Sequence, residues 1–269
     1  MIMETNDFDL KSNIKVRIRD NVKAAIKEYE GREGCNTTFG EPIIGYVSVD
    51  HPMFMLFFDE GVSSHPKEIY RPGNTLIVHF VPYSKEIIES NRGGELPSQA
   101  WSSAFYDSMH LSMYLNRVIR DTLDEVGRIH SSTAVPTDWN DETHRPSWSH
   151  KLAAYAASLG RFGIGGSFHT EMGFGGRLDS VLVDEHYAPF EEKDLARFDF
   201  DQVLGHIRTD SKYLGAEDVE VSPEAISACP GGAITEEGID RKKCQDYCKT
   251  INEYIPSPEV CGKCFFYDI

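Results

Sequence analysis

Two long stretches of the chain place apolar residues at the spacing of an amphipathic helix. In residues 11–30 the apolar positions among the charges are Ile14, Val16, Ile18, Val22, Ile26 and Tyr29. In residues 97–127 they are Trp101, Ala104, Phe105, Leu111, Leu115, Val118, Ile119, Leu123 and Val126. Apolar residues that recur at i, i+3 and i+4 lie on one face of a helix. The pattern therefore predicts a first helix that ends near Gly31 and a longer helix that forms the spine of the first domain.

Continuous apolar runs predict buried strands elsewhere in the chain. Residues 74–82 (NTLIVHFVP) are typical of such a strand, which a turn at residues 71–73 introduces. Residues 42–58 are also strand-prone, although Pro52 interrupts them, and a short strand is expected at residues 132–136. His79 lies inside the first of these runs. We expect a hydrogen-bonded core histidine there, with a side chain that faces a cofactor as the alternative.

Residues 147–184 are rich in glycine and alanine. Ser147 is placed to cap a helix that contains the small-residue run 152–157 and ends at Gly160. Residues 160–166 hold too many glycines for regular structure, and residues 167–170 and 177–184 read as a hairpin around residues 171–176. Small side chains let a flat cofactor or another backbone approach closely. The alternative is a glycine-rich corner that only packing requires.

Composition and charge narrow the function classes. The chain has 269 residues, of which 40% are hydrophobic, as in an ordinary folded protein. No run approaches the roughly 18 apolar residues of a membrane helix, and the first ten residues hold no export signal, so we expect a cytoplasmic protein with no membrane partner. The formal net charge of −16 repels phosphate backbones and disfavours a nucleic-acid partner.

Five of the six cysteines stand at or after Cys229, and such a density needs a chemical reason. Disulfides require an oxidising compartment, which the missing export signal argues against. A zinc site usually has two close cysteine pairs, whereas only Cys261 and Cys264 form one here. The sequence Cys229-Pro-Gly-Gly-Ala-Ile matches the end of a bacterial ferredoxin motif, so an iron–sulfur cluster is favoured over both alternatives. Cys35 stands alone and is expected to be an inert thiol.

This C-terminal segment resembles the iron–sulfur part of the epoxyqueuosine reductase and reductive dehalogenase family. The family motif is a Cys-Pro-x-Gly-Ala-Ile, an isolated cysteine and a Cys-x2-Cys, and the resemblance implies one [4Fe-4S] cluster with the ligands Cys229, Cys244, Cys261 and Cys264. Cys248 is the alternate ligand. The cysteines that hold the family's other cluster are all absent, so this chain resembles a short relative with a single cluster.

The resemblance extends to residues 147–184, which in this family lie against cobalamin in a nitroreductase-like domain. The cofactor-binding residues that it implies are Ser149, His150, Ala153, Gly160, Phe162, Gly163, Gly165, Arg177 and Ser180. Leu159, Gly173 and Asp184 match the same pattern. Because nitroreductase-like cores also hold flavin, FMN is the alternative cofactor.

One departure from the family concerns the chemistry itself. The relatives carry Asp-Ser-Ala-Pro near residues 132–136, where its acid lies close to the reaction centre, but this chain has Ser-Thr-Ala-Val-Pro. Asp138, Asp141, His144 and Tyr106 are the weak candidates to replace that acid. The missing acid, the missing cluster and the negative charge together argue against the tRNA activity of the named relative.

The resemblance and the patterns together imply an α+β fold, a nitroreductase-like sandwich with a C-terminal ferredoxin-like lobe. We expect a cofactor-binding domain in residues 1–190, and a linker with a helix at 201–207 followed by the iron–sulfur lobe in residues 191–269. The expected function is the transfer of single electrons from the cluster to a corrinoid, for reductive chemistry or for reduction of the corrinoid. A ferredoxin or flavodoxin would be the donor, and a small molecule or a corrinoid protein the acceptor. A flavin-dependent reductase and a non-catalytic docking module are the alternatives.

Overall fold

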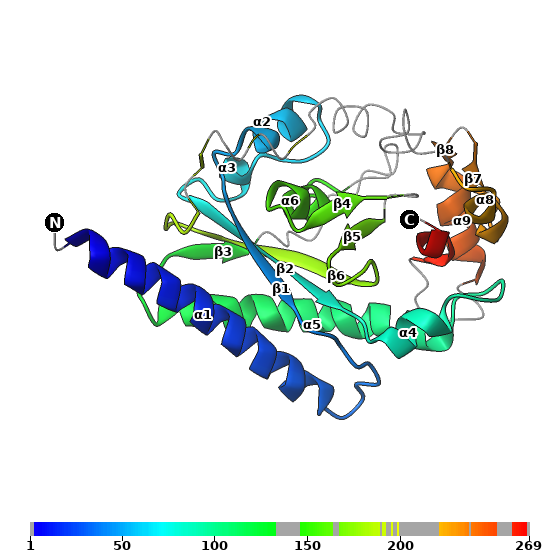
Figure 1. Ribbon diagram of the computed structural model, residues 1–269, viewed down its shortest axis with the longest axis horizontal. Helices are drawn as coiled ribbons and strands as arrows, with labels where there is room; N and C mark the ends of the chain where they lie inside the picture. Colours follow the sequence, from blue (N-terminus) through cyan, green and yellow to red (C-terminus); the bar gives the residue numbers. More distant parts are fainter. Residues whose placement is uncertain are drawn as a thin grey trace.

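A computed structural model describes residues 3–132, 146–163, 167–188, 190–191, 195, 198, 221–236, 238–251 and 260–267. The expectations for Asp138, Asp141, His144, Gly165 and a helix at 201–207 lie outside these residues. Helices and antiparallel strands are mixed along the chain, which confirms an α+β fold (Figure 1). None of the described helices is both long and apolar enough to cross a membrane.

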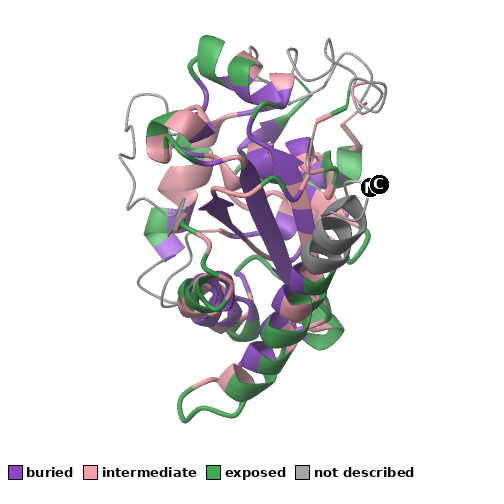
Figure 2. Cartoon of the chain, turned by 90° about the vertical axis from the view of Figure 1, so that its left-hand side faces the viewer, coloured by how far each residue is buried: buried purple, intermediate pink, exposed green. Residues whose placement is uncertain are grey.

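A four-stranded antiparallel sheet forms the centre of the molecule. Its strands are β1 (Ile43–Ser48), β2 (Thr75–Pro82), β6 (Gly176–Val183) and β3 (His130–Ser132), in that spatial order. Every residue of β2 is buried, as expected of an apolar run between two other strands, and Figure 2 shows the buried sheet inside the helices. The strand predicted at residues 74–82 is therefore confirmed.

One face of the sheet packs against the two long helices, α1 (Met3–Glu30) and α5 (Gln99–Asp124). The apolar stripes of both helices meet Ile77 and Val181 of the sheet in one core. Both helices were predicted, but α1 begins earlier than residue 11. Val16 was placed on the buried stripe and is 46% exposed instead, since it lies off the face that carries Ile14 and Ile18.

The opposite face is covered by α2 (Pro52–Asp59), with α3 (Pro66–Ile69) beside it, and by α6 (His150–Ala156). The expected strand character of residues 42–58 holds only for β1, because residues 52–59 form a helix. Pro52 occupies the start of that helix, where it needs no amide hydrogen, and His51 Nδ1 accepts a hydrogen bond from the Met53 amide. The proline therefore starts a helix here and does not break a strand.

The glycine-rich region differs from the prediction in two ways. Residues 160–162 form a strand, β4 (Gly160–Phe162), which pairs with β5 (Phe168–Thr170), whereas β6 joins the central sheet. The hairpin predicted between residues 167–170 and 177–184 is therefore wrong. A side chain at Gly160 would overlap the carbonyl oxygen of His169 across the β4–β5 pair. Glycine is needed there for close strand packing.

The boundaries of α6 also differ from the prediction. Ser149, and not Ser147, is the N-cap, and its hydroxyl accepts a hydrogen bond from the Leu152 amide at 3.3 Å. The helix ends at Ala156 and not at Gly160, and Ser158 adopts the left-handed conformation (φ 57°) after it. The helix is consequently shorter than the small-residue run suggested.

A small C-terminal lobe contains α8 (Pro223–Ala228), β7 (Ile234–Thr235), β8 (Gly238–Ile239), α9 (Arg241–Ile251) and the 3-10 helix η3 (Lys263–Tyr267). It lies beside α4 (Lys85–Ser90) and the start of α5 (Figure 1). The hydrogen bonds that hold the C-terminal segment there include Asn91 Nδ2 to Cys261 O at 3.0 Å, Lys263 Nζ to Asn91 O at 2.9 Å, and Trp101 Nε1 to Val260 O at 2.9 Å. Asn91 is fully buried, so the hydrogen bonds between Asn91 and the C-terminal segment, called the polar joint below, are shielded from solvent.

Candidate functional site

The five C-terminal cysteines come together in the small lobe. Cys229 ends α8, Cys244 and Cys248 lie one turn apart on α9, and Cys261 and Cys264 flank the start of η3. Residues four apart share one helix face, so α9 directs both of its thiols to the same side. Cys229, Cys244 and Cys264 pack against the lobe's apolar core of Ala225, Ile234 and Ile239.

The thiols are close enough to affect one another's ionisation. Burial, with smaller effects of neighbouring thiolates, raises the pKa of Cys261 to about 11 and raises the pKa of Cys264 further. A hydrogen bond to Cys248 is the main cause of the raised pKa of Cys244, and the same bond lowers the pKa of Cys248. A bound metal cation is the usual means of turning such buried thiols into thiolates.

Donors and positive charges surround this set of thiols. The Ala233 amide donates a hydrogen bond to Cys229 Sγ at 3.2 Å, as a thiolate ligand requires. Lys151, from α6, lies near Cys264 and Cys244 and near Arg241 of α9. Solvent reaches Lys151, yet the surrounding protein atoms and, second, Arg241 lower its pKa to about 8. These groups offset the negative charge that ionised cysteines would bring.

Two further observations bear on the metal site. Among the residues that the structure describes, no group of three or more His, Cys, Asp or Glu side chains is arranged to hold a single metal ion. Cys35 is distant in sequence and pairs with other groups: its Sγ lies 3.5 Å from Thr37 O and 4.0 Å from Asp107 Oδ2. Burial raises the pKa of the Cys35 thiol, as expected of an inert cysteine.

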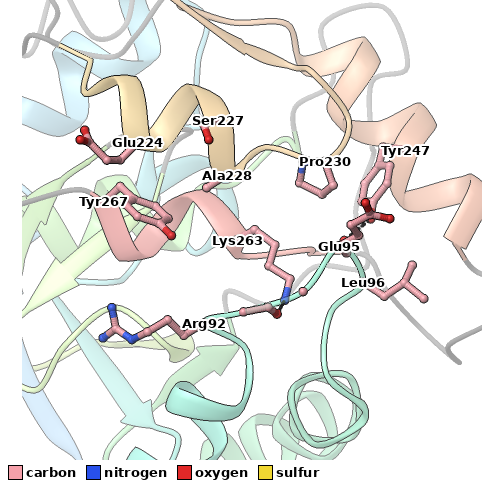
Figure 3. Close-up of a pocket in the computed structure, with 12 residues that line it drawn as sticks. Arg92, Glu95, Leu96, Glu224, Ser227, Ala228, Pro230, Tyr247, Lys263 and Tyr267 are labelled. Atoms are coloured by element: carbon pink, nitrogen blue, oxygen red, sulfur yellow. Dashed lines mark hydrogen bonds between the residues drawn. The ribbon is translucent and has the colours of Figure 1, made fainter.

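An open pocket of about 670 Å³ lies between the lobe and the loop that follows α4. Figure 3 shows Pro230 and Tyr247 on one side of the pocket, Arg92, Glu95 and Leu96 on the other, and Lys263 reaching across it. Tyr247 donates a hydrogen bond to Glu95 O at 2.6 Å and interacts electrostatically with the thiols of Cys261, Cys248 and Cys229. One wall of the pocket is therefore directly next to the cysteines.

The implied cofactor-binding residues gather around α6, β4 and β6. Ala153 is buried under α6, and Phe162 lies between the rings of Tyr155 and Phe168, at 5.6 and 5.4 Å. The Gly163 amide donates a hydrogen bond to Ser167 O at 3.1 Å. Arg177 of β6 lies 5.7 Å from the centre of the Phe105 ring of α5. Tyr106, a candidate for the missing acid, is 50% exposed on α5, and its ring lies 4.5 Å from that of His110 at an interplanar angle of 51°.

A buried polar cluster was missed in part by sequence reasoning. His150 Nδ1 lies 3.0 Å from Ser180 Oγ, and His150 Nε2 lies 3.6 Å from Asp179 Oδ1. Asp179 is 3% exposed and interacts with His79 and with Asn116 of α5. His150 and Ser180 were predicted as site residues, whereas Asp179 and Asn116 were not. The available signal was an aspartate inside the strand sequence Leu-Asp-Ser-Val-Leu-Val.

Comparisons with known proteins give the following result. No protein-family model and no curated protein matches the chain. Solved structures of epoxyqueuosine reductases do match it. The enzyme from Streptococcus thermophilus is 15% identical, with a TM-score of 0.48 over 92% of this chain. An epoxyqueuosine reductase in complex with a tRNA stem loop is 13% identical, with a TM-score of 0.49 over 94%. A selenomethionine-labelled enzyme is 13% identical, with a TM-score of 0.47 over 91% of this chain, which spans 64% of that protein's length.

Proposed function

We propose that this protein is an iron–sulfur oxidoreductase that carries one [4Fe-4S] cluster in its C-terminal lobe. Cys229, Cys244, Cys261 and Cys264 would hold the cluster, with Cys248 as the alternate ligand. We also propose the finer description of the fold, a nitroreductase-like domain in residues 1–190 followed by a linker and a ferredoxin-like lobe. A cytoplasmic location suits thiols that must stay reduced.

The gathering of the five thiols, which come from three separate segments, is the observation that carries this proposal. A single ion would draw its ligands into direct contact with one point, whereas a four-iron cluster holds its cysteines further apart, around a larger body. The amide donor at Cys229 and the cations Lys151 and Arg241 suit an anionic cluster. Hydrogen bonds and charges of this kind set the reduction potential of such centres.

The proposed electron acceptor is a corrinoid bound at the face made by α6, β4 and β6. Ser149, His150, Gly163, Arg177 and Ser180 would line it, and Lys151 connects this face to the cysteines. A corrinoid supplies a strongly nucleophilic reduced cobalt once a low-potential donor has delivered single electrons to it. The protein's part is to hold the ring, exclude water and position protons.

A ferredoxin or flavodoxin is the proposed electron donor, and a small molecule or a corrinoid protein is the proposed final acceptor. The pocket beside Pro230 and Tyr247 is where the donor would approach, because its wall adjoins the cysteines. The net charge of −16 supports the expectation that nucleic acid is not the substrate.

The proposal is tested by anaerobic reconstitution with iron and sulfide, followed by separate titrations with cobalamin and FMN. Broad absorbance at about 400 nm would report the cluster, and distinct corrin or flavin bands would identify the second cofactor. Binding of FMN alone would favour a flavin-dependent reductase. A cluster without either cofactor would favour a non-catalytic docking module.

A further inference from the structure

The buried polar cluster around Asp179 has a charge that packing alone does not explain. The Asp179 carboxylate is 3% exposed, and its acidic group stays ionised because its interactions with His150 and His79 outweigh the opposing effect of burial and hold its pKa below the ordinary value. Burying a carboxylate is costly unless a charge or strong hydrogen bonds compensate it. Among the described residues, its ion-pair partner is the imidazole of His150, which is neutral or charged depending on pH.

Hydrogen bonds from two further groups hold the Asp179 carboxylate in place. The Ser180 amide donates to Asp179 Oδ1 at 2.7 Å, and the Asn116 side chain also hydrogen-bonds to Asp179. Asn116 Oδ1 lies 2.9 Å from His79 Nε2, so with its amide nitrogen donating to Asp179, its oxygen accepts from His79. Since a carboxamide does not carry protons, Asn116 fixes the position of Asp179 and His79 rather than linking them as a proton path.

His79 was expected to be a fully hydrogen-bonded core residue, and this is only half correct. Its side chain is completely buried and its Nε2 is paired, but Nδ1 has no hydrogen-bond partner among the described residues. Burial lowers the pKa of His79 and so opposes its protonation. The cluster therefore contains one fixed negative charge and two imidazoles that can each accept a proton.

His150 is the member of this cluster that solvent or a ligand can reach. Its side chain is 25% exposed, whereas that of Asp179 is 4% exposed. Ser180 Oγ fixes its Nδ1, so Nε2 is the ring atom that faces Asp179. The last described residue of β3, Ser132, pairs with Val181, so Ser180 and Asp179 are the next residues of β6 beyond that pairing. His150 thus lies beside residues of β6 that no described residue of β3 pairs with, next to the face proposed for the cofactor.

We propose that His150 carries the proton that accompanies reductive chemistry at this face, and that Asp179, Asn116 and His79 position it and stabilise its charged form. This inference rests on the proposed function, because that function supplies the electrons. An electron reaches the site from the ferredoxin-class donor by way of the cysteine centre, and His150 takes a proton from solvent. The imidazolium then gives its proton to the anionic product of reduction and returns to neutral imidazole. Asp179 remains ionised throughout.

The charges that face His150 set the direction of its response. Burial is the main cause that lowers its pKa, Arg177 and His79 lower it as well, and Asp179 opposes them. A negative charge that arrives nearby favours protonation of His150. Reduction of a bound acceptor should therefore draw a proton onto His150.

The test uses the reconstituted protein with cobalamin as the probe, and follows the Co(II)/Co(I) midpoint potential against pH. We expect the potential to become more negative as the pH rises in the wild type, and to be independent of pH in His150→Gln. Asp179→Asn should shift the pH-dependent region to lower pH, because removing the carboxylate lowers the pKa of His150 further. His186→Gln, which changes an exposed imidazole elsewhere, should behave as the wild type.

The outcomes separate the inference from the function on which it rests. Bound cobalamin with a pH-independent potential in the wild type, or an unchanged pH dependence in His150→Gln, would overturn the role of His150 and leave the proposed function standing. Failure of the wild type to bind cobalamin would overturn both the corrinoid and this use of His150. If Asp179→Asn does not fold, His150→Gln still decides, because His150 is partly exposed and glutamine can keep the hydrogen bond to Ser180.

Discussion

The backbone amide of Ala233 donates a hydrogen bond to the sulfur of Cys229 at 3.2 Å. The residues between them are Pro230, Gly231 and Gly232, and Gly232 has a positive φ of 58°, which turns the chain back toward the sulfur. Gly231 passes against Tyr247, where a side chain would come within 2.7 Å of the Tyr247 Cβ. The Cys-Pro-Gly-Gly-Ala sequence thus builds a small cradle for one thiolate.

Cys248 offers the sharpest test of the ligand assignment. Cys248→Ala should keep about four irons per chain after anaerobic reconstitution, since four other cysteines complete a cluster. Cys244→Ala should lose the iron, because a cluster that lacks one thiolate is labile. Loss of iron in Cys248→Ala together with its retention in Cys244→Ala would reverse the assignment of this pair. Cys35→Ala is the matched control and should change neither iron content nor stability.

The polar joint between the C-terminal lobe and Asn91, at the end of α4, should contribute to stability. Asn91→Ala removes the hydrogen bond to Cys261 O, and also the one that Asn91 Oδ1 accepts from the Ser98 amide, so we expect a loss of about 1–3 kcal/mol or more in the free energy of unfolding. Urea unfolding measures the loss, and iron release by a chelator should become faster in the same variant. Glu89→Gln removes only an exposed ion pair with Arg92 and is the control. Equal stability of the two variants would show that the joint does not hold the lobe in place.

Two glycines of the β4 region should differ in their response to substitution. Gly163→Val should remove cofactor binding and keep the cluster, if residues near Gly163 border a flat ring. Gly160→Val should instead destabilise the fold, because its side chain would overlap His169 O. Cofactor titration and thermal unfolding distinguish these effects. Loss of fold and cluster in Gly163→Val would support the packing interpretation of the whole region.

The stability of the protein should fall on mild acidification. Burial lowers the pKa of His79 in the folded state, so below about pH 6.5 the unfolded chain binds a proton that the folded chain does not. The free energy of unfolding should therefore decrease as the pH drops from 6.5 toward the folded pKa. His79→Gln should show a weaker decrease in urea unfolding series at matched pH values. The same pH dependence in both proteins would contradict this account of His79.

Sequence patterns predicted the elements whose burial is one-sided or complete. The apolar stripes of α1 and α5 were identified because the helical spacing repeats over several turns. The strand β2 was identified because its apolar run continues over eight residues. Residues 52–59 were misjudged because an all-apolar segment has no period, and the role of Pro52 depends on His51 as the cap. The β4–β5 pair was missed because the glycines of residues 160–166 were taken to exclude regular structure, although Gly160 permits a close approach of the two strands.

The candidate site was predictable where spacing along the chain reflects chemistry. The C-terminal cysteines fall in short motifs, and the structure brings them together. Asp179 and Asn116 carry no motif, since they lie on β6 and α5 and meet only when the helix packs on the sheet. Sequence alone does not show that Asp179 contacts Asn116 of α5. Nor does it show that the neighbouring Ser180 contacts His150 of α6.

The most direct test of the central claim is a count of iron, sulfide and unpaired spins in the anaerobically reconstituted wild type and in Cys229→Ala. The account predicts about four irons and four sulfides per chain in the wild type, with about one spin per chain after reduction by dithionite. It predicts that Cys229→Ala retains neither iron nor the spin signal while remaining folded. One tightly bound zinc ion per chain with no iron, or a full cluster in Cys229→Ala, would contradict it.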